Sequence, residues 1–500
     1  MFQVNRRISG LQGDPSSPIE PVGLPIDEKI LPQYLKDLGY QTHLVGKWHL
    51  GFCRKEFTPT KRGFDTHFGY YNGWVRYNDS VTTGGNFIGF DARRNLQPAA
   101  EEVSGKYLTE VYTDEAVNII KNHDRRQPLF LDFSHVAVHA IKTYPHLQVA
   151  DEEENDRKFS YISDKIRRLY AGVLDSLDQS VGKVIAALDE NKLLENSIII
   201  FMSDNGGPTI DPLYKFLNSA SNWPLRGLKS SFFDGGVRGA AAIWSPLLKY
   251  RHVVSNELFH ISDWLPTLIA AAGGKIDESL DLDGVDQWSY LTGQQPKSGR
   301  HEVLVNIDHE RGLYGIISKK WKLIHCNATY NISFADHYYG IPARNDSEIS
   351  YNMDVVLQSA ASAVLTKYSS RVKNSGQLFD QIRQKANIEG SCKERINAGL
   401  APPVEQCKDY LLFNLERDPC EFQNIKARAP SIVKYMKRRL DYFESQCIPI
   451  QTFPNDPNAN PDRFGGYWTW WLDFSENPNG VAVISSGLTI LVAMVLYKVR

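Results

Sequence analysis

Hydrophobic residues in the first half of the chain alternate between a helical spacing and short unbroken runs. In DEKILPQYLKDLGY, residues 27–40, apolar side chains recur at the spacing of one helix face, and QTHLVGKW at 41–48 then has the pattern of a strand. The same order returns as TEVYTDEAVNIIKNH before PLFLDFSH, and as a long helical pattern over 158–194 before SIIIFMSD. Three helix-then-strand pairs indicate right-handed parallel crossovers. The pattern therefore predicts an α/β fold in which helices sandwich a mainly parallel sheet.

The pattern changes beyond about residue 300. Shorter strand-like stretches follow, VLVNID, LYGIIS and KKWKLIH, and the helical pattern PSIVKYMKRRLDYFES comes later. This pattern of short strands predicts a smaller C-terminal domain that contains an antiparallel sheet. We therefore expect a first domain over 1–305, a C-terminal subdomain over 306–472 and a separate hydrophobic tail over 479–497.

Charge and cysteine content narrow the class of protein. The 500-residue chain has a net charge of −2 and only 23% charged residues, which argues against a nucleic-acid partner. Of its six cysteines, five lie at or beyond residue 326 and no two have C-x-x-C spacing, so lumenal disulfides are favoured over zinc binding. Four N-x-S/T sequons also favour the secretory pathway; they begin at Asn78, Asn327, Asn331 and Asn345.

The start of the chain lacks the pattern of a signal peptide, whereas the tail has the pattern of a membrane segment. The start, MFQVNRRISG, has no apolar signal-peptide region, so we expect a start that has been displaced or truncated. The tail 479–497 carries no charge and is followed by Lys498 and Arg500, which predicts a membrane-spanning helix, with a lipid-anchor signal as the alternative. The expected location is the lysosome or the cell surface, with membrane attachment through this tail.

One of the apolar runs ends in residues that can bind a ligand. SIIIFMSDNGG, residues 197–207, reads as a strand buried on both faces that stops at Asp204 and Asn205. Parallel sheets bind ligands at the carboxyl ends of their strands, and the two following glycines let the backbone turn sharply. The stretch therefore predicts a binding site at this strand end, although D-N-G-G is by itself usually only a turn.

Other predicted strand ends carry further polar residues. VGKWHLG holds Lys47 and His49, SHVAVHA holds two histidines, and NWPLRGLKSSFFDGGVRG holds several charged groups; these additional candidates are His135, His139, Arg226, Lys229, Asp234 and Arg238. If the sheet is parallel, these ends converge on a site with oxygen ligands for a hard cation, fixed positive charges and imidazoles. Such a set suits a sulfuryl or phosphoryl group, with a histidine to protonate the leaving alcohol. Taken singly, each residue also has an ordinary structural interpretation.

Several longer motifs resemble one enzyme family. GYQTHLVGKWHLG, RGFDTHFGYYNG, SDNGG, SNWPLRGLKSSFFDGGVRG, ISDWLPTLIAAAGG and LFNLERDPCEFQNI are similar to the type I sulfatases, and most closely to the arylsulfatase B (N-acetylgalactosamine-4-sulfatase) branch. The resemblance runs from about residue 10 to about residue 471. It implies an alkaline-phosphatase-like fold and hydrolysis of sulfate esters on glycosaminoglycan sugars, with one bound calcium ion.

The resemblance also implies roles for individual residues. Asp204 and Asn205 match two calcium ligands, and Lys47 and Lys229 match the lysines that grip sulfate. Two histidines match catalytic positions: His49 lies beside the formylglycine of the family, and His139 lies near the leaving oxygen. His135 and Arg226 match no catalytic position.

The chain departs from the family at its start. The family nucleophile is a cysteine in a C-x-P-S-R motif that matures to formylglycine, but no cysteine here precedes Cys53, whose context CRKEF is different. The pair of metal-binding aspartates expected on the first strand is missing as well. We therefore predict a half-built metal site and a polypeptide that is inactive alone, although its full-length parent is a sulfatase.

Two other functions remain open from the sequence. A phosphoester or phosphonate hydrolase of the same superfamily would be expected to have a serine or threonine nucleophile and more histidine and aspartate ligands for paired zinc. A non-catalytic protein could instead use Lys47, Lys229 and neighbouring aromatic residues to bind sulfated glycans.

Overall fold

A computed structural model provides the fold. It describes residues 17–211, 215–249, 252–277, 279–280, 282–327, 334–337, 352–368, 376–388, 392, 407, 409–448, 453–474, 482–483 and 492–497.

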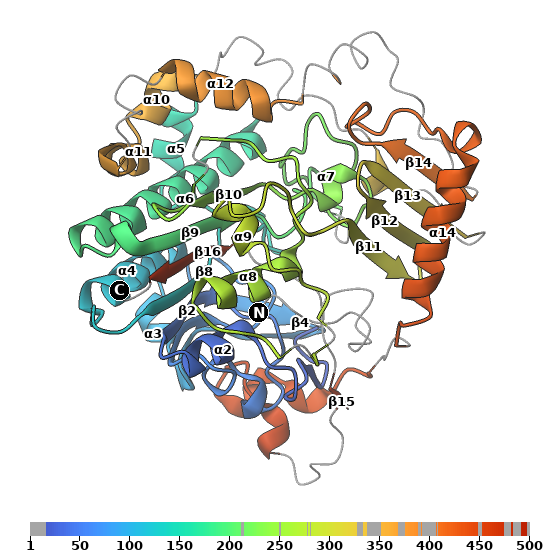
Figure 1. The fold of residues 1–500 in the computed structure, drawn as a ribbon. Helices are drawn as coiled ribbons and strands as arrows, with labels where there is room; N and C mark the ends of the chain where they lie inside the picture. Colours follow the sequence, from blue (N-terminus) through green and yellow to red (C-terminus); the bar gives the residue numbers. More distant parts are fainter. Residues whose placement is uncertain are drawn as a thin grey trace.

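An eight-stranded sheet forms the centre of the molecule (Figure 1), with the strand order β10-β9-β16-β8-β2-β3-β6-β7. In that order the strands are β10 (Ala241–Trp244), β9 (Ser197–Met202), β16 (Val492–Tyr497), β8 (Leu129–Ser134), β2 (Gln41–Lys47), β3 (Thr66–Tyr70), β6 (Arg93–Arg94) and β7 (Gln97–Pro98). β2 pairs in parallel with β3 and with β8. β8 and β9 both run antiparallel to β16, so they are parallel to each other. The predicted mainly parallel core is confirmed.

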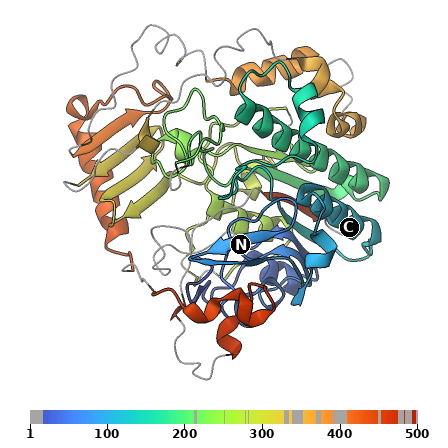
Figure 2. The same cartoon turned by 180° about the vertical axis from the view of Figure 1, so that it is seen from behind.

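Helices cover both faces of this sheet. Side chains alternate along each strand, so successive residues pack against opposite helix layers. On β8, Leu129, Leu131 and Phe133 belong to the core under α4 (Leu108–Asn122) and α6 (Lys165–Glu190). Phe130, between them, belongs to the opposite core, under α2 (Leu31–Asp37) and α8 (Trp264–Ala271). Figure 1 labels all four helices, and Figure 2 shows the same arrangement from behind. The unbroken apolar run of β8 thus reflects burial on both faces.

Shorter elements surround the two layers. The remaining helices and strands of this part are β1 (Val22–Gly23), β4 (Val81–Gly84), β5 (Phe87–Phe90), α3 (Ala100–Val103), α5 (Glu152–Lys158), α7 (Asp234–Val237), α9 (Trp288–Leu291), α10 (Met353–Leu357), α11 (Ala360–Leu365), α12 (Gly376–Ala386) and β15 (Ala482–Val483). The segment 453–474 returns to this part of the chain: the Trp468 carbonyl accepts a hydrogen bond from Arg93, and Leu472 N–H donates to the Cys53 carbonyl at 3.1 Å.

The hydrophobic tail does not support the expected membrane helix. Its residues 492–497 form β16, which pairs with β8 on one side and β9 on the other, and Met494, Val495 and Leu496 are buried. The physical reason is that β8 and β9 would otherwise leave a row of unpaired N–H and C=O groups inside the sheet. Among the described residues, no helix has the length and apolarity needed to cross a membrane.

A second, smaller sheet lies to the right in Figure 1. Its strands β11 (Glu302–Asp308), β12 (Leu313–Ser318), β13 (Trp321–Cys326) and β14 (Tyr410–Asn414) pair antiparallel in sequence order. Helix α14 (Pro430–Glu444) packs on it through Met436 and Leu440. The predicted antiparallel C-terminal sheet is therefore confirmed.

Four of the six cysteines form disulfides in this C-terminal part. Cys326 bonds to Cys407, and Cys392 bonds to Cys420. The expectation of disulfides among the five later cysteines is confirmed. Of the sequon asparagines, Asn78 is exposed and Asn327 is partly buried, whereas Asn331 and Asn345 lie outside the described residues.

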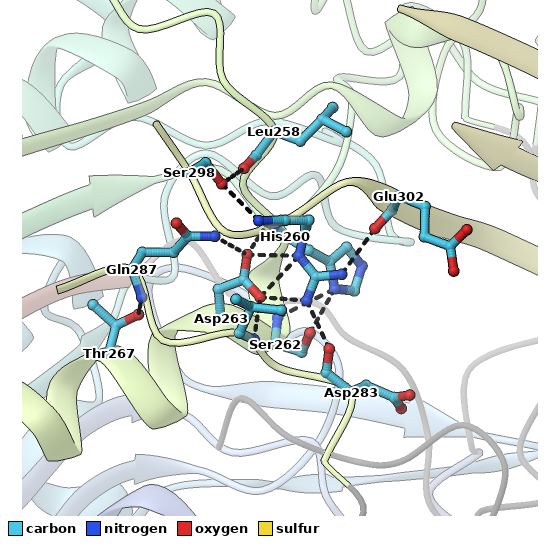
Figure 3. Close-up of polar contacts among 11 residues, drawn as sticks. Leu258, His260, Ser262, Asp263, Thr267, Asp283, Gln287, Ser298 and Glu302 are labelled. Carbon is cyan, nitrogen blue, oxygen red and sulfur yellow. Dashed lines mark hydrogen bonds and ion pairs between the residues drawn. The ribbon is translucent and has the colours of Figure 1, made fainter. Parts of the chain in front are cut away.

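A buried ion pair joins the two parts near the start of α8 (Figure 3). Arg300 Nε donates to both carboxylate oxygens of Asp263, at 2.9 and 2.8 Å, and Arg300 Nη1 donates to the Glu302 carbonyl at 3.0 Å. The same carboxylate accepts from the backbone N–H groups of His260 and Val285, each at 2.8 Å. This cluster fixes the beginning of β11 to the helix layer of the central sheet.

Acid is expected to destabilise this fold through buried histidines. The Nε2 atom of His135 contacts Ser180 Oγ at 2.8 Å, and burial lowers the pKa of His135 to about 3 and that of His67 to about 3. Because an unfolded histidine titrates near pH 6.5, the stabilising contribution is complete above about pH 6.5 and is lost as the pH falls toward 3. Each histidine costs up to about 1.4 kcal/mol per pH unit in this range.

Urea unfolding at pH 7 and pH 5 tests this expectation. Asp132 acts in the opposite sense, because burial raises its pKa to about 6, so the net loss is smaller than the histidine contributions. The variant His135→Gln should narrow the difference in unfolding free energy between the two pH values. An unchanged difference in this variant would show that His135 does not carry the effect.

Candidate active site

The candidate residues lie where the central strands end. Lys47 is the last residue of β2, and Asp204 and Asn205 follow one residue after the end of β9. His139 belongs to the loop after β8, and Lys229 belongs to the loop that precedes α7. β2, β8 and β9 run in the same direction, so their carboxyl ends lie at one edge of the sheet.

Electrostatic interactions show that these residues converge. Lys47 is only 3% exposed, and its pKa is lowered to about 7, first by burial and then by the charge of Lys229, while Asp204 opposes the shift. Burial lowers the pKa of His139 well below its ordinary value, and Lys229, Lys47 and His49 lower it further. Lys47 is therefore close enough to interact with Lys229 and Asp204, and His139 with both lysines and His49.

His49 is held by a close backbone approach. Its φ angle is 51°, and its backbone N–H donates to the Tyr71 carbonyl at 2.9 Å. A Cβ atom on Gly73 would lie 2.7 Å from Cε1 of the imidazole, so no larger residue fits there without displacing the ring. The segment 71–73, which follows β3, therefore packs against the imidazole and forms a wall of the site.

His139 is oriented by its own loop. Its Nδ1 lies 2.6 Å from the Ala140 carbonyl, and because a carbonyl only accepts, Nδ1 carries the hydrogen. The His139 carbonyl in turn accepts a hydrogen bond from the Tyr77 hydroxyl at 2.9 Å. The neutral ring therefore presents Nε2 as a hydrogen-bond acceptor.

Asp204 and Asn205 present two oxygens that could bind a cation. Asp204 Oδ1 accepts from the Asn205 backbone N–H at 2.9 Å, while Oδ2 is buried without a hydrogen-bond partner among the described residues. Asn205 Nδ2 donates to the Gly206 carbonyl at 2.9 Å, a contact that does not use Oδ1. An orphaned buried carboxylate oxygen beside an amide oxygen fits a hard cation. The described residues contain no group of three or more His, Cys, Asp or Glu side chains suited to a metal ion.

The other sequence candidates have structural contacts. His135 is 6% exposed, and its ring lies 4.4 Å from that of Phe133. Arg226 is 3% exposed, donates from Nε to the Asp336 carbonyl at 2.9 Å and lies over the Phe233 ring. Both side chains are therefore part of the packing. Asp234, the first residue of α7, and Arg238, just after this helix, form an ion pair with each other at 3.7 Å.

A wide cleft opens from this cluster. Its volume is 2410 Å³, and its lining includes His49, Asp204, Asn205 and Lys229. Small-molecule pockets usually measure about 300–1,000 Å³. The cleft continues between β10 and β11 as far as Lys319, so there is room for a ligand larger than one sugar ring.

The ends of the central strands thus bring together lysines, histidines and the oxygens of Asp204 and Asn205. Comparison with known proteins makes the class specific. The sequence model of the family described as Sulfatase matches residues 4–274. Arylsulfatase J of Mus musculus is 36% identical over 465 residues, which cover 93% of this chain and 70% of that protein.

The chain belongs to the sulfatase family. Mouse N-acetylgalactosamine-6-sulfatase is 32% identical over 272 residues, covering 53% of this chain and 49% of that protein, so the chain spans about half the length of this relative. The crystal structure of Ps i-CgsB has a TM-score of 0.59 at 22% identity, over 94% of this chain and 84% of that one, which shows a shared fold. Membership identifies the chain as a sulfuric ester hydrolase by family. The predicted sulfatase resemblance is confirmed, while closeness to the arylsulfatase B branch stays a prediction.

Proposed function

We propose that the cluster binds the sulfate group of a sulfated sugar in the orientation needed for ester hydrolysis. The observation that carries this proposal is that Lys47 interacts with Lys229 and Asp204, and that His139 interacts with both lysines, at one edge of the central sheet. The pKa of Lys47 is lowered first by burial and then by repulsion from the ammonium group of Lys229. A bound sulfate relieves this repulsion because it places negative charge between them.

The proposed roles follow from the atoms that each residue presents. Lys47 and Lys229 contact sulfate oxygens, and His49 is held against Gly73 on the same wall. His139 presents Nε2 toward the leaving oxygen; to act as an acid it must first gain a proton, which the two lysines oppose and a bound anion favours. Asp204 and Asn205 would hold one calcium ion, which when bound neutralises charge on the sulfate oxygens.

The proposed substrate is sulfated N-acetylgalactosamine within a glycosaminoglycan chain. The sequence resembles the 4-sulfatase branch, and a relative over about half of the chain bears the name N-acetylgalactosamine-6-sulfatase. The extent of the cleft supports an oligosaccharide. The two disulfides and the exposed Asn78 support a place in the secretory pathway, with the lysosome or the cell surface as the proposed destination.

Replacing Lys229 is expected to weaken sulfate binding. Lys229→Met removes one of two positive charges from the site, so the affinity for N-acetylgalactosamine 4-sulfate, measured by calorimetric titration with calcium present, should fall about tenfold to a hundredfold. The matched control is Lys36→Met, because Lys36 is exposed and paired with Asp65 beside the start of β2, at the other end of the strand from Lys47. Equal affinities for sulfated and unsulfated sugar, or an unaffected Lys229→Met, would refute the proposed site.

A further inference from the structure

A buried ion triad lies between the candidate active site and the small sheet. Lys322, on β13, is 0% exposed, and its Nζ lies 2.8 Å from Asp234 Oδ1 and 2.8 Å from Glu421 Oε1. Glu421 is also 0% exposed, and Asp234 is 3% exposed. Although burial alone lowers the pKa of Lys322, the two carboxylates raise it above its ordinary value, so the ammonium group stays charged. Charges so fully removed from water are tolerated only when each has a partner.

Glu421 also makes a contact that sets backbone position. Its Oε2 accepts a hydrogen bond from the Asp234 backbone N–H at 2.6 Å, at the first residue of α7. The φ angle of Glu421 is 56°, a left-handed conformation that costs energy for a residue with a side chain. The C-terminal part therefore maintains an unfavourable backbone conformation at the residue that reaches α7, which lies between the two sheets in Figure 1.

From Asp234 the contacts lead into the active-site loops. Gly235 N–H donates to the Arg226 carbonyl at 2.7 Å, which closes the loop that carries Lys229. Gly206 N–H donates to the Gly236 carbonyl at 2.9 Å. A Cβ atom on Gly206 would lie 1.7 Å from the Gly235 carbonyl oxygen, so the two backbones are in direct contact. Moving α7 must therefore move the turn after Asp204 and Asn205.

We propose that Lys322 and Glu421 are positioning residues for the sulfate site. They touch neither sulfate nor cation; they clamp Asp234, and through α7 they set the distance between Lys229 and the turn that holds Asp204 and Asn205. This inference rests on the proposed function. It assigns a role in substrate binding to the small antiparallel sheet, which otherwise contributes no residue to the proposed contacts with sulfate.

A second buried pair provides a control for simple domain attachment. Asp263 and Arg300 are 0% and 9% exposed by side chain, and they join the same two parts of the molecule (Figure 3). Their hydrogen bonds within the described part of the chain lead to the start of α8, to the segment 283–287 and to the first residue of β11, and none leads to 204–207 or 226–238. Loss of either pair should lower stability, but only loss of the triad should disturb the site.

The test compares Lys322→Met with Arg300→Met in the full chain. Hydrogen exchange should be faster in 204–207 and 226–238 in Lys322→Met, with no such change in Arg300→Met, while the melting temperatures of both fall. The affinity for N-acetylgalactosamine 4-sulfate, titrated with calcium present, should fall about tenfold in Lys322→Met alone. If either methionine variant fails to fold, Glu421→Gln and Asp263→Asn form a milder matched pair, since each exchanges a buried carboxylate for an amide.

Each outcome bears on one proposal. Faster exchange at the two loops in Lys322→Met but not in Arg300→Met supports positioning; unchanged exchange at these loops, or the same change in both variants, overturns it. A wild-type chain that binds no sulfated sugar refutes the proposed function, and the exchange measurement still decides whether the triad positions the loops. Binding that is equally strong in wild type and Lys322→Met overturns the role in substrate binding.

Discussion

Incubated with 4-nitrocatechol sulfate, this polypeptide is expected to release no sulfate above the uncatalysed background. The sequence contains no cysteine in a C-x-P-S-R context, and loss of a covalent nucleophile lowers turnover by about a millionfold in well-studied hydrolases. Cys53 cannot substitute, because it is 1% exposed and its thiol donates to the Val22 carbonyl at 3.4 Å. Burial also raises the pKa of this thiol to about 12, so almost no thiolate forms at neutral pH.

The assay needs both a positive and a negative control. A sulfatase that has the C-x-P-S-R motif confirms the conditions, and Cys53→Ala should leave the background rate unchanged. Turnover by the present chain that disappears in Lys229→Met would contradict the prediction and would require another nucleophile within this sequence. Sulfated-sugar binding without turnover would instead agree with a chain that retains the sulfate-binding cluster and lacks the attacking group.

Removing the Cys326–Cys407 disulfide is expected to cost the fold about 4 kcal/mol. The bond joins the end of β13 to the segment before β14 across 81 residues, and cross-links that close long loops restrict the unfolded chain most. Both sulfur-bearing residues also belong to the buried core of the small sheet with Leu411 and Phe413. The free energy of unfolding of Cys326→Ala/Cys407→Ala, compared with wild type in urea, gives the value directly.

Cys447 provides the matched control for that measurement. It is partly buried and belongs to neither disulfide, so Cys447→Ala should change the unfolding free energy by less than about 1 kcal/mol. A similar loss of unfolding free energy in Cys447→Ala would show that the effect comes from cysteine packing and not from the cross-link. No loss in the double variant would show that the bond does not constrain the unfolded state.

Local pattern was enough to predict the main elements. The apolar spacing of 27–40, 41–48 and 197–204 indicated α2, β2 and β9, because each element buries a face whose period the sequence displays. The parallel arrangement of strands then placed Lys47 and Asp204 at one edge of the sheet, where their charges interact in the structure. These inferences needed only neighbouring residues and a general rule of sheet topology.

Side-chain partners over long distances were not predictable in the same way. His135 looked like a possible catalytic group, yet its contact with Ser180 places it in the core. The sequence did not indicate a role for Lys322 or Glu421, because nothing in their local pattern shows that folding buries both charges. Their significance comes from burial and from contact with Asp234.

The sequence by itself determined the α/β class, the antiparallel second sheet and the strand ends that carry the lysines, the histidines and the pair Asp204 and Asn205. Tertiary structure decided what fills the centre of the sheet. The apolar run at the chain end suits a membrane helix by hydropathy and a buried strand by its residue types, and the unpaired edges of β8 and β9 select the strand at 492–497. A residue pattern records which side chains avoid water, whereas their partners depend on which surfaces meet when the chain folds.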